Sequence, residues 1–180
     1  MAKAKTAVFT ITDGVTLNNG QSGAANMVTM DVGHMIDAAS SQGLEILSAD
    51  FMFQNSLTSA GSFSPDIGAS FGADSTVTVQ LTDVNPGTAL VGATDRSLVA
   101  STNLHYGHGD NIVTSASDFQ PDSFEGDGRY VVNDTLYLTA DPSTTIVSNQ
   151  NLEISCRLRC KIVTLSKKDW IALALQTGPL

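Results

Sequence analysis

Hydrophobic and polar residues alternate with a period of two along most of this chain of 180 residues. In residues 76–83 (TVTVQLTD), apolar side chains take the odd positions from Val77 to Leu81 and polar side chains take the even positions. In residues 152–165 (LEISCRLRCKIVTL), even positions 154 to 162 are apolar and odd positions 153 to 161 are polar. This alternation is typical of a strand with one buried and one hydrated face. Further strands are predicted at residues 6–12, 27–32, 44–55, 97–106, 111–117 and 129–139.

Three segments carry more specific local predictions. Within residues 44–55, the period of two places four side chains on one face: Leu47, Ala49, Phe51 and Phe53. Asn19-Gly20 predicts a tight hairpin turn, because Asn and Gly tolerate the positive φ that its two central positions require. Residues 33–43 fit either a short helix or a wide loop, and the pattern leaves both open.

These patterns predict an all-β fold, an antiparallel β-sandwich or single jelly roll of about eight strands. No period of about 20–50 residues repeats, which excludes solenoids and propellers. Ser166 and Asp169 form a capping box before an apolar segment, which favours a short C-terminal helix over a final strand. We expect residues 1–180 to form one domain, with a long Gly/Ser-rich loop at 57–75 and a C-terminal tail at 166–180.

Composition and charge narrow the class of protein. Charged residues make up 15% of the chain against about 25% in typical domains, while hydrophobic residues make up 42%, which argues against both disorder and a helix-rich protein. The net charge is −9, and between Thr6 and Leu152 the only basic residues are Arg96 and Arg129. Most of the chain therefore repels nucleic acid and anionic lipid at long range, because phosphate binding needs clustered Lys and Arg.

Three features bear on the cellular compartment. The N-terminal segment has only about five apolar residues before Thr12, fewer than the roughly 7–15 of a signal sequence, so we expect synthesis in a host cytoplasm without Sec export. No stretch approaches the ~20 apolar residues of a membrane-spanning helix. Cys156 and Cys160 are about 13 Å apart in a predicted strand, too far for a disulfide, so we expect buried free thiols in a reducing interior.

Residues 68–72 (GASFG) match the G-x-S-x-G pattern of hydrolases, with Ser70 at the nucleophile position. The carboxylate of that mechanism would be Asp83 or Asp95, and the base would be His105 or His108. The mechanism needs the serine on a turn between a strand and a helix, whereas a strand is predicted to follow here. We therefore interpret residues 68–72 as part of a flexible loop and predict no catalytic residues and no enzyme activity.

Two clusters could hold a metal ion. His105, His108 and Asp110 offer imidazole and carboxylate ligands within six residues, but a zinc site needs further ligands that no nearby cluster supplies. Asp122, Glu125 and Asp127 concentrate carboxylates in a loop without the spacing of an EF-hand. We interpret the first cluster as a hydrated hairpin loop and the second as an acidic turn, so no metal and no cofactor is predicted.

Asn133-Asp134-Thr135 matches a glycosylation sequon. In a chain without a signal peptide, we interpret it as a strand residue or bulge.

A basic stripe at the C-terminal side of the chain is the strongest candidate for a binding surface. It comprises Arg157, Arg159, Lys161, Lys167 and Lys168. Its strand residues project from one face, about 6.6 Å apart. One interpretation is a solvated face whose charges pair with neighbouring carboxylates. The other is a contact surface for the acidic face of another copy, for phosphate headgroups or for encapsidated nucleic acid.

Three segments together resemble the single jelly-roll capsid proteins of icosahedral viruses. They are residues 130–141 (YVVNDTLYLTAD), 152–165 and 166–175 (SKKDWIALAL). They look like the penultimate strand, the last long strand and the C-terminal anchor of such a subunit. RNA-packaging members of the group begin with an Arg-rich arm, whereas this chain has only Lys3 and Lys5 there. The resemblance therefore implies a shell that closes through protein contacts, with an internal membrane or the genome as a further contact of the basic stripe.

We predict a structural virion protein, a capsid subunit that self-assembles with its own copies and with other capsid proteins, located in the virion and without a small-molecule substrate. The alternative is a glycan-binding or adhesive β-sandwich module, either lectin-like or from a phage appendage. Such a module stacks sugars on exposed aromatic rings, for which Tyr106, Phe119 and Phe124 are the candidates.

Overall fold

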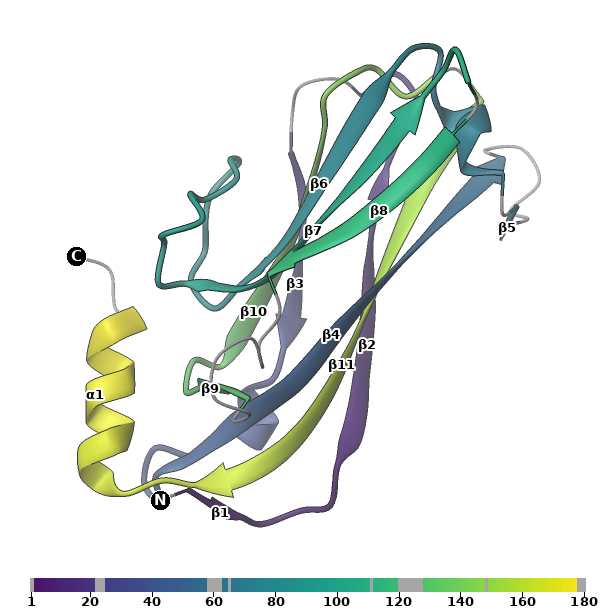
Figure 1. The fold of residues 1–180 in the computed structure, drawn as a ribbon. Coiled ribbons are helices and arrows are strands. Elements are labelled where there is room, and N and C mark those ends of the chain that lie inside the picture. The colour runs from purple at the N-terminus through teal and green to yellow at the C-terminus, as the bar shows by residue number, and fades with distance from the viewer. Residues whose placement is uncertain are drawn as a thin grey trace.

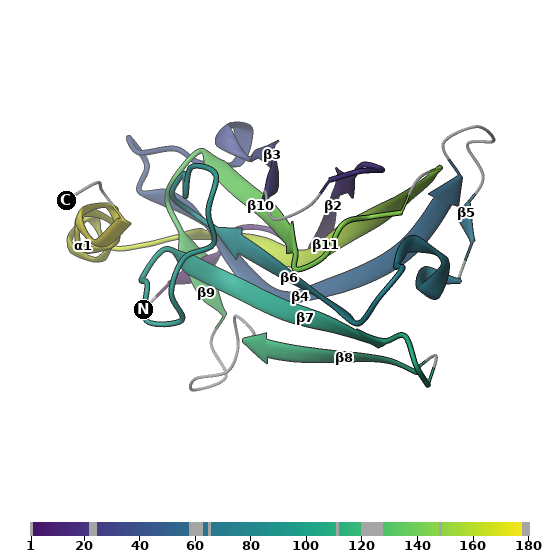
Figure 2. The same ribbon diagram turned by 90° about the horizontal axis from the view of Figure 1, so that it is seen from above.

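The computed structural model describes residues 2–21, 25–57, 63–64, 66–110, 112–119, 128–147 and 149–177. Within them, two antiparallel sheets pack face to face (Figures 1 and 2). Sheet A contains β1 (Lys3–Ala4), β2 (Phe9–Leu17), β4 (Gln42–Leu57), β5 (Phe63–Ser64), β9 (Arg129–Val131) and β11 (Gln150–Thr164). Sheet B contains β3 (Asn26–Asp31), β6 (Ser75–Thr82), β7 (Leu98–Gly107), β8 (Ile112–Phe119) and β10 (Thr135–Pro142). The helices are η1 (Gly33–Met35), η2 (Ile67–Ser70) and α1 (Lys167–Thr177).

The strand pairing defines a jelly roll. Strand β2 pairs with β11, β3 with β10, β4 with β9, and β6 with β7, so that each pair is nested inside the one before it along the chain. Pairing of β11 with β4 and of β10 with β6 then completes the two sheets. This is the topology of a long hairpin rolled into two sheets, and it confirms the predicted fold class. The short C-terminal helix is also confirmed.

The inner faces of the two sheets carry the residues that the alternation placed there. Val77, Val79 and Leu81 of β6 are 0% exposed. In β11, the even positions from Ile154 to Cys160 are at most 1% exposed. Burial of each large aliphatic side chain contributes about 1.5–3 kcal/mol, so this shared core is the main source of stability.

A β-bulge at Leu47 corrects one prediction. Arg159 pairs with Ser48 but Cys160 pairs with Ile46, so Leu47 has no partner on β11. The extra residue reverses which positions point inward. Leu44 and Ile46 are therefore the apolar residues of the core before the bulge, and Leu47, predicted to share a face with Ala49, is only partly buried.

The turn at Asn19-Gly20 exists but does not close a hairpin. Gly20 has a φ of +75°, and Gln21 N donates to Asn18 O over 3.1 Å. Asn19 does not have a positive φ, and the flanking strands lie in different sheets. The hairpin prediction was wrong because the turn carries the chain from sheet A to sheet B.

Three other segments differ from their predicted form. The strand predicted at 129–139 is two strands, β9 and β10, which belong to different sheets and are separated by a bend at Asn133-Asp134. Residues 33–43 contain the short helix η1 followed by turns, which is a combination of the two alternatives. The described part of the loop predicted at 57–75 contains β5 and η2.

The outer faces of the two sheets are covered differently. On sheet B, the segment between β6 and β7 folds back over the strands, and the Gln80 side chain both donates to Val91 O (2.9 Å) and accepts from Val91 N (2.8 Å). Gln80 and Thr82 are 7% and 0% exposed, so the hydrated face predicted for this strand is buried at its end. On sheet A, by contrast, the outward residues Thr10, Thr12, Arg157 and Arg159 are exposed.

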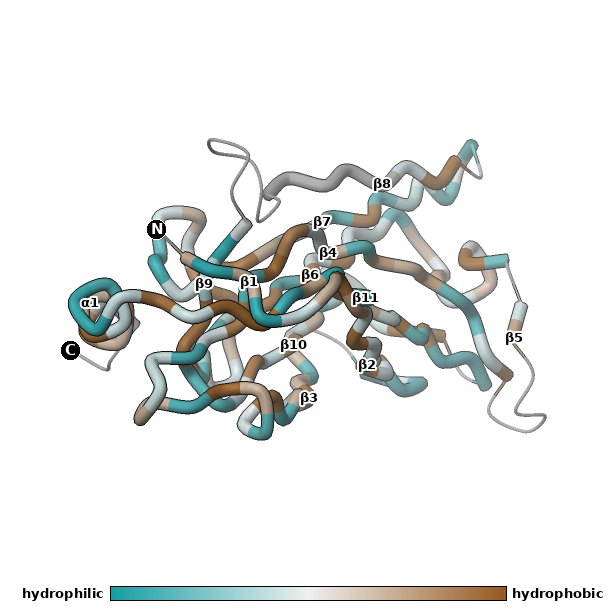
Figure 3. Tube along the Cα trace, turned by 90° about the horizontal axis from the view of Figure 1, so that it is seen from below, coloured by the Kyte–Doolittle hydropathy of each residue, from teal (hydrophilic) through white to brown (hydrophobic). Residues whose placement is uncertain are grey.

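Helix α1 begins at the capping box that the sequence predicts. Asp169 N donates to Ser166 Oγ over 3.1 Å, and Ser166 Oγ donates to Asp169 Oδ2 over 2.7 Å. The helix lies at one end of the sandwich, here called the basal end (Figure 1), where Trp170 packs against a small cluster that includes Val163 and Leu165. The residues of α1 are mixed in hydropathy (Figure 3). None of the helices in the described residues is long and apolar enough to cross a membrane.

Candidate functional site

The five cations of the basic stripe have three different environments. Arg157 and Arg159 lie exposed on the outer face of sheet A. Lys161 Nζ lies 3.1 Å from Glu45 Oε1 of β4, and the Glu45 side chain is only 4% exposed. Lys167 and Lys168 are exposed in the first turn of α1. Lys161 therefore forms an ion pair within the chain, and the five cations of the basic stripe do not form a uniform contact surface.

Arg157 and Arg159 differ in their cross-strand neighbours. Arg157 lies between Asp50 of β4 and Thr12 of β2, whereas Arg159 lies between two hydroxyl residues, Ser48 and Thr10. The two ion pairs found in the described part of the chain include neither arginine. Arg159 is thus an exposed cation without a carboxylate opposite it on either neighbouring strand.

A partly buried ion pair connects the two sheets at the basal end. Arg129 Nη2 of β9 lies 3.3 Å from Asp83 Oδ2, which follows β6, and also donates to Arg96 O. Asp83 is 1% exposed, and its Oδ1 has no hydrogen-bond partner. Burial raises the pKa of Asp83 above its ordinary value of 3.8, and the charge of Arg129 opposes this shift.

The residues of the hydrolase pattern do not come together. Ser70 is 0% exposed and its Oγ accepts a hydrogen bond from Asn55 Nδ2 over 2.9 Å. Ser70 precedes β6 and Asp83 follows it, and a strand of eight residues spans about 26 Å. Asp95 accepts hydrogen bonds from its neighbour Ser97, which lower its pKa. A serine side chain without access to solvent cannot reach a substrate, so Ser70 does not fit the nucleophile of a triad.

The candidate metal ligands have other partners. His105 Nδ1 lies 3.0 Å from Thr76 Oγ1, and the backbone N of His108 donates to Asp74 Oδ1 over 2.7 Å. Asp110 is exposed in the turn after β7. The described residues contain no group of three or more potential metal ligands. Asp122, Glu125 and Asp127 lie outside the described residues.

The proposed aromatic platform for sugars is contradicted at Tyr106. This residue is 5% exposed and its ring stacks on Phe71, with the centroids 5.4 Å apart. A ring inside the core cannot stack on a sugar, so the prediction for Tyr106 was wrong. Phe124 lies outside the described residues, as does the side chain of Phe119.

Both cysteines are free and buried, which the sequence predicts from their spacing. Burial raises the pKa of Cys156 and of Cys160 to about 12. At neutral pH both are therefore thiols that contribute to the core and are poor nucleophiles and metal ligands.

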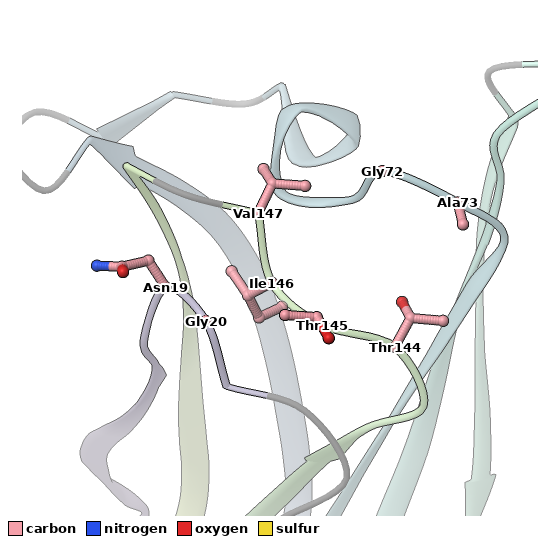
Figure 4. A pocket seen from close by; sticks show the side chains of 8 residues that line it. All are labelled: Asn19, Gly20, Gly72, Ala73, Thr144, Thr145, Ile146 and Val147. Atoms are coloured by element: carbon pink, nitrogen blue, oxygen red, sulfur yellow. The ribbon is translucent and has the colours of Figure 1, made fainter.

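Two cavities lie at opposite ends of the sandwich. The apical cavity, of about 570 Å³, lies between the turn after β2, the segment after η2 and the segment before β11 (Figure 4). Its lining includes Asn19, Thr144 and Thr145. The basal cavity, of about 780 Å³, is lined by aliphatic residues such as Ile36 and Val132 together with polar and aromatic residues that include Asp83, Asn85, Asp134, Tyr137 and Trp170.

Sequence reasoning missed the two buried carboxylates, Glu45 and Asp83. Glu45 did carry a signal, since it is the one charged residue in an apolar run, Leu44 to Leu47, and buried carboxylates are paired. Asp83 carried none, because an aspartate after a strand is the usual composition of a turn. Its partner, Arg129, is one of the two cations between Thr6 and Leu152, and only the fold brings them together.

No family model and no curated protein matches this chain. Solved structures of VP1 from Trichodysplasia spinulosa-associated polyomavirus are similar to it. VP1 in complex with GM1 oligosaccharide is 8% identical, with a TM-score of 0.48 over 91% of this chain and 97% of the VP1 chain. VP1 in complex with 3'-sialyllactose is 9% identical, with a TM-score of 0.47 over 91% of this chain and 98% of the VP1 chain. VP1 is a jelly-roll capsid protein of a virus, and such proteins are the group that the sequence resembles. The assignment of a jelly roll to this chain is based on its own strand order.

Proposed function

We propose that this chain is a structural subunit of a virion shell and that its copies associate through contacts between different surfaces of neighbouring molecules. Such heterologous contacts form rings or closed shells when their rotation closes. Jelly rolls occur in viral capsids and in lectins, so the fold class alone does not select between these functions. The distribution of charge over the two sheets is the observation that supports the shell.

Positive charge is confined to one of the two sheets. The described strands of sheet B contain no Lys and no Arg, whereas those of sheet A contain five such residues, namely Lys3, Arg129, Arg157, Arg159 and Lys161. Arg129 and Lys161 are paired within the chain, which leaves exposed Lys3 at the edge of the sheet and Arg157 and Arg159 on its outer face. The same face also carries Asp50 and Glu153, so it holds charges of both signs. On a molecule of net charge −9, the two exposed arginines are points that can attract an acidic surface of a further copy.

Contact with a membrane or a genome receives less support than contact with another copy. A phosphate surface is bound by many clustered cations, each of which adds about 1 kcal/mol near a membrane. The outer face of sheet A offers only the two exposed arginines of β11. We therefore propose copies of the chain, together with other capsid proteins, as the partners, and the virion as the location.

The test compares the wild-type chain with Arg157→Glu/Arg159→Glu. Size-exclusion chromatography and negative-stain electron microscopy of purified protein, free of lipid and nucleic acid, report on assembly, and circular dichroism reports on folding. We expect particles from the wild type and a folded, unassembled chain from the variant, because reversed charges face the acidic surface of the neighbour. Assembly of the doubly changed protein into normal particles would exclude this face as the contact.

A second candidate function is glycan binding at the apical cavity. Asn19, Thr144 and Thr145 line this cavity together with aliphatic Ile146 (Figure 4), a combination that fits the polar and apolar faces of a sugar. Retention of the wild-type monomer on a glycan resin, lost in Thr145→Arg, would support this function. Equal elution of the two proteins would exclude it.

A further inference from the structure

We propose that Arg159 of one copy inserts its guanidinium group into the basal cavity of a second copy, between the carboxylate of Asp134 and the rings of Tyr137 and Trp170. This inference rests on the proposed function and names the two surfaces that meet. It assigns the donor to the outer face of sheet A and the acceptor to the end of the molecule that carries α1.

Of the two exposed arginines of β11, the donor is the one with the weaker local electrostatic compensation. Arg159 faces Ser48 and Thr10 on the neighbouring strands, whereas Arg157 faces Asp50. The side chains opposite each other on one face of a sheet lie about 4.5–5.5 Å apart at Cβ, so Asp50 attenuates the charge of Arg157. Arg159 remains available to a carboxylate from outside the molecule.

The acceptor cavity has the chemistry that selects a guanidinium. Its volume is about 780 Å³, and its lining combines the exposed carboxylate of Asp134 with the aromatic residues Tyr137 and Trp170. A guanidinium forms charge-assisted hydrogen bonds to carboxylates and stacks on aromatic faces, which an ammonium group does less well. An acidic and aromatic cavity therefore favours Arg over Lys as its occupant.

Asp134, the exposed carboxylate of this cavity, belongs to neither of the ion pairs found in the described residues. Asp83, which also lines the cavity, is buried and has one oxygen, Oδ2, on Arg129 while its Oδ1 has no hydrogen-bond partner. Two carboxylate residues, Asp31 and Asp134, lie close to Gly33. A Cβ atom placed on Gly33 would lie 3.2 Å from Asp31 Oδ1 and 3.2 Å from Asp134 Cβ. A cation from a second copy would reduce the repulsion among these groups.

The experiment is a charge exchange between the two surfaces in the full-length chain. Arg159→Glu and Asp134→Lys are each expected to raise the protein concentration needed for half-assembly by about tenfold or more. Combination of the two substitutions in one chain is expected to restore assembly, because the exchanged charges again attract. Sedimentation velocity measures the assembled fraction, and circular dichroism verifies that each variant is folded.

The matched control is Arg157→Glu, which makes the same reversal of charge as Arg159→Glu on the same face of the same strand. Its combination with Asp134→Lys is expected to remain impaired. If Asp134→Lys rescues Arg157→Glu and Arg159→Glu equally, the specific pairing of Arg159 with this cavity is wrong and only a general attraction between charges remains. Arg159→Lys is expected to assemble less well than the wild type, because an ammonium group cannot make the stacked, forked contact, and equal assembly would contradict the proposed aromatic contact.

Failure of this inference is distinguishable from failure of the proposed function. If the purified wild-type chain forms no particles at any concentration, the proposed function fails and the pairing fails with it. If the wild type assembles and Arg159→Glu assembles equally well, the shell function stands and the pairing is wrong. If Arg159→Glu is impaired and Asp134→Lys does not rescue it, Arg159 contacts a different partner, and binding to anionic lipid vesicles or to nucleic acid then identifies the class.

Discussion

Lys161 Nζ lies 3.1 Å from Glu45 Oε1, and this pair places a carboxylate in the body of sheet A with an exposed fraction of only 3%. A buried carboxylate that loses its cation retains the cost of its desolvation without the compensating attraction. The pair therefore belongs to the stability of the fold, and it removes Lys161 from the surface available to a partner.

The first prediction concerns this pair. Lys161→Met is expected to lower the free energy of unfolding by about 3 kcal/mol, because Glu45 is left buried and unpaired. The double variant Lys161→Met/Glu45→Gln is expected to recover most of that loss, since no buried charge remains. Urea denaturation followed by circular dichroism measures both. Equal stability of Lys161→Met and the wild type would show that Glu45 does not depend on Lys161.

The second prediction concerns the pH dependence of Asp83. Its pKa in the folded state is raised above 3.8 by burial, so folding favours the protonated carboxyl. The contribution of Asp83 to stability is therefore fully present below pH 3.8 and is lost as the pH rises through the raised pKa. The free energy of unfolding of the wild type minus that of Asp83→Asn should decrease over this interval. A difference that increases with pH would mean that Arg129 outweighs the burial of Asp83.

The third prediction concerns the two thiols. With a pKa of about 12, each of Cys156 and Cys160 is ionised to only about one part in ten thousand at pH 8. Both are also 0% exposed. A colorimetric thiol reagent is expected to detect no free thiol in the native protein and two in denaturant. Rapid reaction of either cysteine in the native state would contradict its burial in the core.

The fourth prediction concerns the segment that covers the outer face of sheet B. Gln80→Ala removes both hydrogen bonds to Val91, at a cost of about 2 kcal/mol, and is expected to loosen the segment. Trypsin should then cleave after Arg96, which lies in this segment, about tenfold faster than in the wild type. Gln54→Ala on sheet A is the control. Unchanged cleavage in Gln80→Ala would show that other contacts hold the segment.

Particular residues show how far the sequence predicts this fold. The period of two identifies β6 and β11 because each has one face in the shared core. Burial follows the alternation at Val77, Val79 and Leu81 and from Ile154 to Cys160, but Gln80 and Thr82 are buried by the segment that covers sheet B. The bulge at Leu47 was not predictable, since one extra residue in an apolar strand leaves the composition unchanged. The break at Asn133-Asp134 was also missed, because both halves of 129–139 have strand propensity and only sheet topology separates them.

The candidate site shows the same division between local and long-range information. Exposure of Arg157 and Arg159 follows from the alternation of β11, which is local. The engagement of Lys161 depends on Glu45, more than a hundred residues away. Tyr106 alternates correctly as a strand residue, but its burial against Phe71 depends on how η2 packs on the sheet. Pairing across the molecule determines which surface residues remain available to a partner.

The mass of the purified protein in solution tests the central claim most directly. Light scattering coupled to size-exclusion chromatography, over a range of protein concentrations and without lipid or nucleic acid, gives this mass. A shell subunit is expected to form closed particles whose mass is a large multiple of 18.8 kDa. A species of 18.8 kDa at every concentration would contradict the account.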